Sequence, residues 1–248
     1  MTLSKGAFLG VLTRSGGPAR DTLRRLRAKS KPAGRRQDLR PRLVLASASP
    51  RRLMLLSQVG VTPDALRPSS IDETPHRAEM PRSLVSRLAR AKAEAARDLI
   101  ADDKELAEAY VLAADTAVAY GRNIFGKPES VEQAHSTLLR LSGRSHHVYT
   151  GLCLITPDDR VRMKIVDTRV RFKRLSRDEI EAYLASREWR GKAGGYAIQG
   201  LAGCFVQKLV GSYTNVVGLP LTEVVNMLVG EGFPVHFNWL KAGEADPD

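Results

Sequence analysis

The chain has 248 residues, of which 43% are hydrophobic, so it is long enough to bury the core of one domain and carry an appendage. No apolar run approaches the roughly 18–20 residues that a membrane-spanning helix needs, and we therefore expect a soluble protein. Two cysteines, Cys153 and Cys204, are too few for a disulfide framework or a cysteine metal cluster and suit a reducing compartment.

The formal net charge of +12 is concentrated in residues 1–41, which hold eleven Lys or Arg against two Asp and so carry +9, leaving +3 for residues 42–248. This extension is rich in Gly, Pro, Ser and Arg, a composition that predicts disorder. It is open to three interpretations: an organelle transit peptide, a nonspecific polyanion-binding arm, or an extension with no role. We expect a cytoplasmic protein, with organelle import as the alternative. Nucleic acid is not expected as a partner beyond nonspecific binding by this arm.

The folded part begins with a strand, a tight turn and a helix. Leu43–Ala46 is apolar, Ser49 stands at a helix N-cap position, Pro50 follows at the first helical position, and the helix extends to about residue 59. Such a turn directs backbone N–H groups and a positive helix end at whatever lies in front of it. Arg51 and Arg52 stand where helix electrostatics favour acidic residues. They either bind an anion or are simply solvated.

A long helix is predicted from Pro81 to about Ile100, and its Lys92 lies beside the buried stripe, where it either snorkels to solvent or reaches into a site. The run Tyr110–Ala119 has the pattern of a strand that is covered on both faces. Asp115, in the middle of this run, is the carboxylate that best fits a functional role, because a buried charge needs a partner, a proton or a metal. A structural aspartate bonded to loop backbone is the alternative.

The remaining elements follow from turn, capping and alternation patterns. A glycine-dense segment, 191–200, matches neither a Walker A nor a Rossmann pattern, and it either lets backbone approach a ligand closely or is a flexible connector. Its Gln199 offers an amide donor and acceptor. The other predictions are a hairpin turn at 121–123 with a strand end at 124–128, a helix capped by Ser130 to about 141, strands at 146–155 and 161–172, a helix capped by Ser176 to about 186, a strand at 204–209, a turn at 211–214 and a helix at 220–229.

These elements predict one α/β domain with a mixed sheet over residues 42–236, followed by a loose tail at 237–248. Parallel units come first and an antiparallel hairpin follows. His146 and His147 are adjacent in a predicted strand, so they point to opposite faces and make a poor metal pair.

From about Arg42 to Phe233 the order and spacing of short motifs resemble the Maf family of nucleotide pyrophosphatases, first described as septum-formation inhibitors. The motifs are Ser47-Ala-Ser-Pro-Arg-Arg52, Asp72-Glu73, Lys92, Ala114-Asp-Thr116, Gly126-Lys-Pro128, Leu141-Ser-Gly143, Lys192-Ala-Gly-Gly-Tyr-Ala-Ile-Gln-Gly200 and Val217-Gly-Leu-Pro220. The resemblance implies a fold similar to that of inosine triphosphate pyrophosphatases, with a cleft between two lobes. It also implies hydrolysis of a nucleoside triphosphate between its α and β phosphates to a monophosphate and pyrophosphate, with Mg²⁺ or Mn²⁺.

The resemblance also assigns roles and a substrate branch. Asp115-Thr116 and Ile198-Gln199-Gly200 match the branch that prefers dTTP and UTP, while Gly195 and Ala197 are small departures from it. CTP and purines are expected to be poor substrates. The implied catalytic roles are Asp115 as proton acceptor and Glu73 as metal ligand, with Asp115 as a second candidate ligand. Specificity is assigned to Arg51, Thr116 and Gln199. The residues expected on the phosphates are Ser47, Ser49, Arg51, Arg52, Lys92 and Lys127, with the two arginines as fixed positive charges.

Three alternatives to this function stay open. The substrate could be a modified pyrimidine nucleotide or 7-methyl-GTP. The protein could be a nucleotide-binding regulator of cell division with incidental hydrolysis, or it could act on nucleic acid through the basic extension, with steep salt dependence. The resemblance also allows a homodimer, for which the sequence carries no diagnostic surface.

Overall fold

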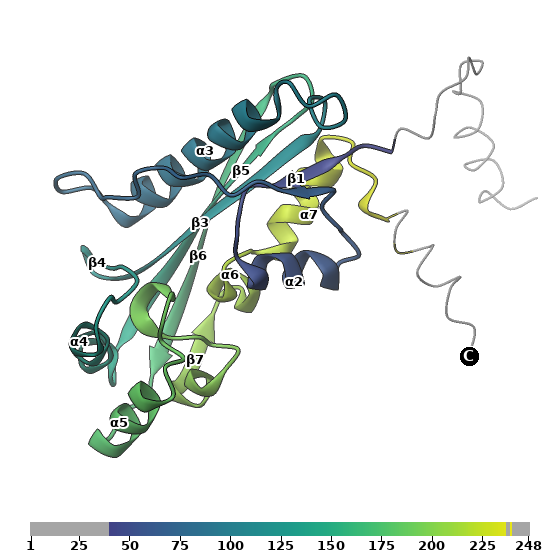
Figure 1. The fold of residues 1–248 in the computed structure, drawn as a ribbon. Helices are drawn as coiled ribbons and strands as arrows, with labels where there is room; N and C mark the ends of the chain where they lie inside the picture. Colours follow the sequence, from purple (N-terminus) through teal and green to yellow (C-terminus); the bar gives the residue numbers. More distant parts are fainter. Residues whose placement is uncertain (1–39, 237–238, 240–248) are drawn as a thin grey trace, which may run out of the picture. The chain divides into compact units, whose positions relative to one another are not determined.

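The structure is a computed structural model that describes residues 40–236 and 239. Its elements, drawn in Figure 1, keep the order expected from the sequence. They are β1 (Leu43–Leu45), α2 (Pro50–Gln58), β2 (Ala65–Leu66), α3 (Pro81–Ile100), β3 (Tyr110–Tyr120), β4 (Asn123–Phe125), α4 (Val131–Leu141), β5 (Ser145–Ile155), β6 (Val161–Phe172), α5 (Arg177–Ala185), η1 (Ala193–Gly195), η2 (Leu201–Phe205), β7 (Val206–Val210), α6 (Tyr213–Val217) and α7 (Leu221–Gly230).

One seven-stranded mixed sheet organises the described residues, in the order β2-β1-β3-β5-β6-β7, with β4 also paired to β3. β1 runs parallel to both β2 and β3, and the other pairs are antiparallel, so the predicted mixed α/β architecture is confirmed. The long β5–β6 hairpin pairs Ser145 with Arg171 at one end and Ile155 with Val161 at the other. This hairpin gives the sheet its length.

Helices cover both faces of the sheet, as Figure 1 shows with α3 on one side and α2, α6 and α7 on the other. The α3 face packs small residues such as Ala89 and Ala93 against Val111 and Cys153 of the strands. The opposite face holds the larger core, built from α2, α4, α5 and α7 against β5 and β6. Because side chains alternate along a strand, residues 113 and 115 of β3 face α3, and residues 114 and 116 face the other core.

The edge of β3 is open in its middle. β1 pairs with β3 only at residues 110–112, and β4 pairs with it only at 118–120. Among the described strands none pairs with residues 113–117 on that side, so side chains from both faces of β3 can reach one space at this edge. Asp115 and Thr116 lie in this gap.

Local details differ from the sequence predictions at several places, one of which is the short strand β2, not among the predicted elements. Cys204 lies in η2 rather than at the start of a strand, and the predicted turn at 211–214 continues into the short helix α6. Ser49 is the N-cap residue of α2, but its side chain makes no capping bond. Ser130 caps α4, yet the Gln133 side chain accepts from the N–H of Glu129 instead of completing the predicted capping box.

Other predictions fall where the structure does not test them. The predicted disorder of residues 1–41 lies outside the described residues up to residue 39, and the loose tail at 237–248 does so except at residue 239. The homodimer stays a prediction. Among the described helices, none is long and apolar enough to cross a bilayer.

Candidate active site

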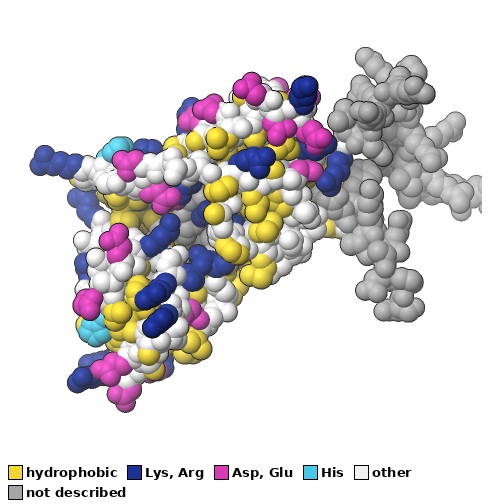
Figure 2. Space-filling model, viewed as in Figure 1, with side chains coloured by type: hydrophobic (Ala, Val, Ile, Leu, Met, Phe, Trp, Pro, Cys, Tyr) yellow, Lys and Arg dark blue, Asp and Glu magenta, His cyan; other side chains and the backbone are white. Residues whose placement is uncertain are grey.

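A pocket of about 370 Å³ lies at the open edge of β3. Its walls come from the β1–α2 turn, the segment before α3, α3 itself, the β4–α4 connection, the glycine-dense segment and the end of α6. Figure 2 shows Lys and Arg side chains gathered near the middle of the face that it draws. All ten residues that the sequence analysis selected line this pocket: Ser47, Ser49, Arg51, Arg52, Glu73, Lys92, Asp115, Thr116, Lys127 and Gln199.

The β1–α2 turn supplies the cationic wall. β1 is fully buried, so it fixes the point at which the chain enters the turn. The Ser47 hydroxyl accepts the backbone N–H of Ser49 at 3.2 Å, which closes the turn just before Pro50 begins α2. The two following arginines then emerge from the first helical turn into the pocket.

The two arginines are held differently. Arg52 donates to the carbonyl oxygen of Gly218 at 2.9 Å, to the Ser47 hydroxyl at 3.2 Å and to the Thr116 hydroxyl at 3.3 Å. Burial lowers its pKa, and the nearby Asp115 opposes that shift, but an arginine stays charged at any physiological pH. Within the described residues the Arg51 side chain forms no hydrogen bond or ion pair. Arg52 is therefore a fixed charge, and Arg51 is the arginine available to a ligand.

A buried ammonium group joins the two carboxylates of the pocket. Nζ of Lys92 lies 2.6 Å from Oδ1 of Asp115 and 2.7 Å from Oε1 of Glu73. Lys92 and Asp115 are almost fully buried, whereas the Glu73 side chain is 45% exposed. Lys127 approaches the other Glu73 oxygen at 3.5 Å. Lys92 therefore reaches into the site and does not snorkel.

Burial sets the acid–base properties of Asp115. It raises the pKa of Asp115 above the ordinary value, although Lys92 and Arg52 both act to lower it. For Glu73, burial acts in the same direction, but the contacts with Lys92 and Lys127 outweigh it and the net pKa is lowered. In the described part of the chain no protein group hydrogen-bonds Oδ2 of Asp115. This oxygen is free to accept a proton from a water molecule in the pocket.

α3 brings Lys92 to Asp115 because the sheet carries a glycine opposite this aspartate. Gly151 of β5 pairs with Asp115, and a Cβ at Gly151 would lie only 2.2 Å from the carbonyl oxygen of Val85. The backbone of α3 thus lies directly on β5. Lys92 follows Val85 by two helical turns and shares its face.

Behind Thr116 lies a buried polar group that the sequence analysis did not find. The hydroxyls of Thr116 and Thr150 are 2.9 Å apart, and Thr150 donates to the carbonyl oxygen of Asn215. The Asn215 side chain in turn donates to the carbonyl oxygen of Val148 and to the Thr168 hydroxyl. Thr150 and Asn215 are fully buried, so this group fixes both Thr116 and the segment that carries Gly218.

The glycine-dense segment forms the remaining wall. Gly194 has φ +69°, and a Cβ there would lie 2.8 Å from the Val118 side chain, so only glycine lets the backbone pass this close to β3. The close approach seen here is to β3, and the approach of this backbone to a ligand stays a prediction. Gln199 lies exposed at the pocket edge, and Lys192, to which the sequence analysis gave no role, also lines the pocket. Burial, with a smaller contribution from Arg51, lowers the pKa of Lys192.

The carboxylates fit a divalent cation that shares its coordination with a substrate. In the described residues no group of three or more His, Cys, Asp or Glu side chains could hold a metal, so a protein-only cage is absent there. Glu73 and Asp115 both lie within hydrogen-bond distance of the same ammonium and face one space. Mg²⁺ typically takes one or two carboxylates and completes its shell with waters and phosphate oxygens.

Comparison with known proteins identifies a family that the chain matches over most of its length. Residues 42–231 match the family model described as Maf-like protein. The chain is 61% identical over 203 residues to the dTTP/UTP pyrophosphatase of Rhodopseudomonas palustris strain BisB5, covering 82% of this chain and 98% of that protein. It is 62% identical over 200 residues to the protein of the same name from Rhizobium meliloti strain 1021, covering 81% and 97%.

Similarity to solved structures is lower. A HAM1 protein from Coxiella burnetii aligns with a TM-score of 0.39 and 17% identity, over 55% of this chain and 75% of that one. A nucleoside-triphosphatase / dITP/XTP pyrophosphatase from Mycobacterium abscessus aligns with a TM-score of 0.33 and 15% identity, over 54% and 75%.

Proposed function

This chain belongs to the Maf family, and we propose that its pocket binds dTTP and UTP and hydrolyses the bond between their α and β phosphates. Relatives that are about 61% identical over nearly their whole length carry the name dTTP/UTP pyrophosphatase. The observation that carries the proposal is one pocket lined both by Asp115, whose Oδ2 is free, and by Arg51, whose side chain is unpaired among the described residues. A general base and a phosphate-binding charge thus line the same pocket.

The triphosphate is held by charges of two kinds. Arg52 is fixed by three hydrogen bonds and gives a cation in one place, while the guanidinium of Arg51 is free for bidentate contact with phosphate oxygens. Lys92 and Lys127 add point charges, and Ser47 and Ser49 place the turn against the phosphates. Such positioning and charge neutralisation supply most of the catalysis in phosphoryl transfer.

Asp115 takes the proton of the attacking water. As water oxygen bonds to the α-phosphorus, the bond from that phosphorus to the bridging oxygen breaks, and pyrophosphate leaves with the electron pair. The water proton passes to Oδ2 of Asp115, while Oδ1 stays bonded to Lys92. A positioned general base of this kind contributes about 10²–10⁴-fold. The raised pKa of Asp115 strengthens it as a base at neutral pH.

Glu73 would hold Mg²⁺ or Mn²⁺, and Asp115, whose two oxygens are used by Lys92 and by the water proton, is assigned as the base and not as a second ligand. When bound, the ion neutralises charge on the phosphate oxygens. Because Lys92 already contacts both carboxylates, it keeps them from repelling each other before substrate and metal arrive.

Gln199, Thr116 and Arg51 select the nucleobase of the substrate. Thymine and uracil present an imide N–H between two carbonyl groups, and a side-chain amide can pair with that edge. A site built on such hydrogen bonds rejects a base that leaves them unmade, because the site's polar groups then stay unpaired. CTP and purine nucleotides are therefore poor substrates.

Both cysteines are free, which suits activity in the cytoplasm.

The test is a substrate panel on the purified full chain. dTTP, UTP, CTP, dATP and 7-methyl-GTP are each incubated with Mg²⁺ or Mn²⁺, and the products are separated by chromatography. We expect dTMP or UMP with pyrophosphate. Diphosphate nucleotides with inorganic phosphate would overturn the cleavage site, and preferential turnover of 7-methyl-GTP or CTP would overturn the base assignment while leaving the reaction intact.

A further inference from the structure

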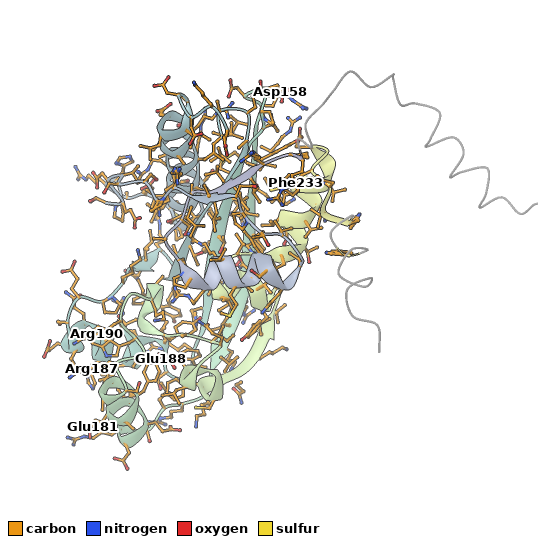
Figure 3. All side chains as sticks on the ribbon, turned by 45° about the vertical axis from the view of Figure 1, so that its right-hand side comes forward. Asp158, Glu181, Arg187, Glu188, Arg190 and Phe233 are labelled. Atoms are coloured by element: carbon orange, nitrogen blue, oxygen red, sulfur yellow. The ribbon has the colours of Figure 1, made fainter. Side chains whose placement is uncertain are left out.

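Glu188, outside the pocket, holds the segment that carries Gln199. Its carboxylate accepts the backbone N–H of Leu201 at 2.8 Å and that of Ala202 at 3.3 Å. These are the first two residues of η2, and Gln199 lies just ahead of them in the chain. Figure 3 labels Glu188 on the segment that follows α5. Hydrogen bonds from N–H groups to a carboxylate are about twice as strong as neutral ones.

The turn that carries Glu188 is itself rigid. The next residue, Trp189, is 2% exposed, and its indole N–H donates to the carbonyl oxygen of Leu184 at 3.1 Å. The Ser186 hydroxyl accepts the backbone N–H of Glu188 at 3.2 Å. Arg187 between them has φ +61°, a strained value for a residue with a side chain. The Glu188 side chain therefore extends from a turn that is held rigidly on the core.

Gly200 lets this carboxylate reach the backbone. A Cβ at Gly200 would lie 2.1 Å from Oε2 of Glu188, so any larger residue there displaces the carboxylate or the chain. The φ of Gly200 is −116°, so the glycine is required for space and not for backbone freedom. The chain thus passes Gln199 and Gly200 and is then tied through two backbone N–H groups to the half-buried Glu188 carboxylate.

We propose that Glu188 is a positioning residue for base recognition, which acts by holding the 198–202 segment so that the Gln199 amide faces the pocket. The inference rests on the proposed function, since it assigns Gln199 to the pyrimidine base. Glu188 itself lies outside the pocket lining and touches no reacting atom. Loss of the Glu188 carboxylate weakens recognition of the substrate's nucleobase and leaves the hydrolytic step at Asp115 unchanged.

The test compares Glu188→Gln, Gln199→Ala and the double variant, each on the full chain. The glutamine keeps the size of the side chain but loses the charge and one acceptor. We expect Glu188→Gln to raise KM for dTTP and UTP about tenfold, the effect of one lost hydrogen bond. The ratio of kcat/KM for dTTP to that for CTP should fall, and kcat for dTTP should stay within about twofold of the wild-type value. In the Gln199→Ala background Glu188→Gln should add almost nothing, because the residue that Glu188 positions is gone.

Glu181→Gln is the matched control. Glu181 lies on α5 and makes an exposed ion pair with Arg177, so its variant should keep the wild-type KM and selectivity. Gly200→Ala is a second route to the same effect, because its Cβ pushes against the Glu188 carboxylate. It should reproduce the selectivity change even where Glu188→Gln folds poorly.

The outcomes separate the two proposals. A wild-type chain that cleaves neither dTTP nor UTP overturns the proposed function. An active wild type whose Glu188→Gln variant keeps KM and selectivity, or whose two single effects multiply in the double variant, overturns the positioning role of Glu188. Amide hydrogen exchange of Leu201 and Ala202 gives a readout without substrate: faster exchange in Glu188→Gln supports the anchor, and unchanged exchange overturns it.

Discussion

At the scale of single residues, Lys92 controls the electrostatics of the pocket. One buried ammonium contacts the proposed base and the proposed metal ligand within 2.7 Å. Two carboxylates this close would otherwise raise each other's pKa, since like charges disfavour ionisation. Lys92 keeps Glu73 ionised and limits how far burial raises the pKa of Asp115.

Replacing Lys92 by methionine should move the acid limb of the pH profile to higher pH. The active form of Asp115 is the deprotonated one, so hydrolysis rises as pH increases through its pKa. Burial already raises that pKa and Lys92 opposes the rise, so removing the ammonium raises it further. The measurement is kcat/KM against pH for dTTP.

Lys127→Met serves as the comparison for this profile. Lys127 is 60% exposed and pairs with Glu73, not with Asp115. The Lys127→Met variant should bind substrate more weakly and keep the acid limb of the pH profile at its wild-type position. An acid limb that stays fixed, or moves to lower pH, in Lys92→Met would contradict the role given to Asp115.

The sequence could identify residues whose pattern is unusual and missed those whose pattern is common. Asp115 interrupts an apolar run, and two arginines follow a helix N-cap, so each draws attention. Thr150 is a threonine in a strand, where threonine is frequent. Its importance comes from the β3–β5 register, which places it directly opposite Thr116, and a register is set by the whole sheet.

At the scale of elements, the irregular segment between β2 and α3 depends on one arginine for its shape. Arg87 of α3 donates to both oxygens of Glu79, at 2.9 and 2.8 Å, and to the carbonyl oxygen of Thr74 at 3.1 Å. Its ion pair lowers the pKa of Glu79 to about 2, so the contact persists at any physiological pH. Thr74 directly follows Glu73, and the proposed metal ligand is thereby tied to α3.

Arg87→Met should therefore raise the Mg²⁺ concentration needed for half-maximal hydrolysis. Residues that orient a metal ligand typically change metal affinity by about 10–100-fold when they are lost. Arg90→Met is the control, because Arg90 lies on the same helix in an exposed pair with Glu94. The rate is followed against Mg²⁺ at saturating dTTP. Equal metal dependence in the two variants would argue against this account of the segment.

Gly151→Ala should force α3 away from the sheet. The new Cβ would meet the backbone carbonyl of Val85 at 2.2 Å, and backbone gives way less easily than a side chain. We expect a loss of about 1–3 kcal/mol in the free energy of unfolding, together with reduced activity because Lys92 moves with α3. Urea denaturation measures the first effect.

Gly230→Ala provides the control for this prediction. Nothing lies within 4 Å of a Cβ at Gly230, at the end of α7, so the variant should keep or slightly gain stability. Wild-type stability in Gly151→Ala would mean that α3 does not rest on β5 as closely as described.

Elements with strong local signals were predictable, and short ones were not. α3 and the β5–β6 hairpin have long periodic patterns, and their predicted bounds agree closely with the structure. α6 has five residues, which is too short for a periodic pattern, so its sequence predicts only a turn. It forms because Ser212 caps it and Asn215 anchors it to the sheet.

At the scale of the whole molecule, the pocket exists because the sheet is incomplete along one strand. β1 and β4 cover the two ends of β3 and leave residues 113–117 open, so Asp115 from one face and Thr116 from the other reach the same space. No local sequence pattern encodes this gap. The resemblance to the Maf family brought the ten residues together, and the sheet topology explains why they meet.

The assignment of Asp115 as general base is tested by pyrophosphate release from dTTP, measured for the full chain and for its Asp115→Asn variant. Binding of a nonhydrolysable dTTP analogue is measured for both. We expect Asp115→Asn to release pyrophosphate at least about a hundredfold more slowly and to keep its affinity for the analogue. An Asp115→Asn variant that binds the analogue and still releases pyrophosphate at the wild-type rate would contradict the assignment.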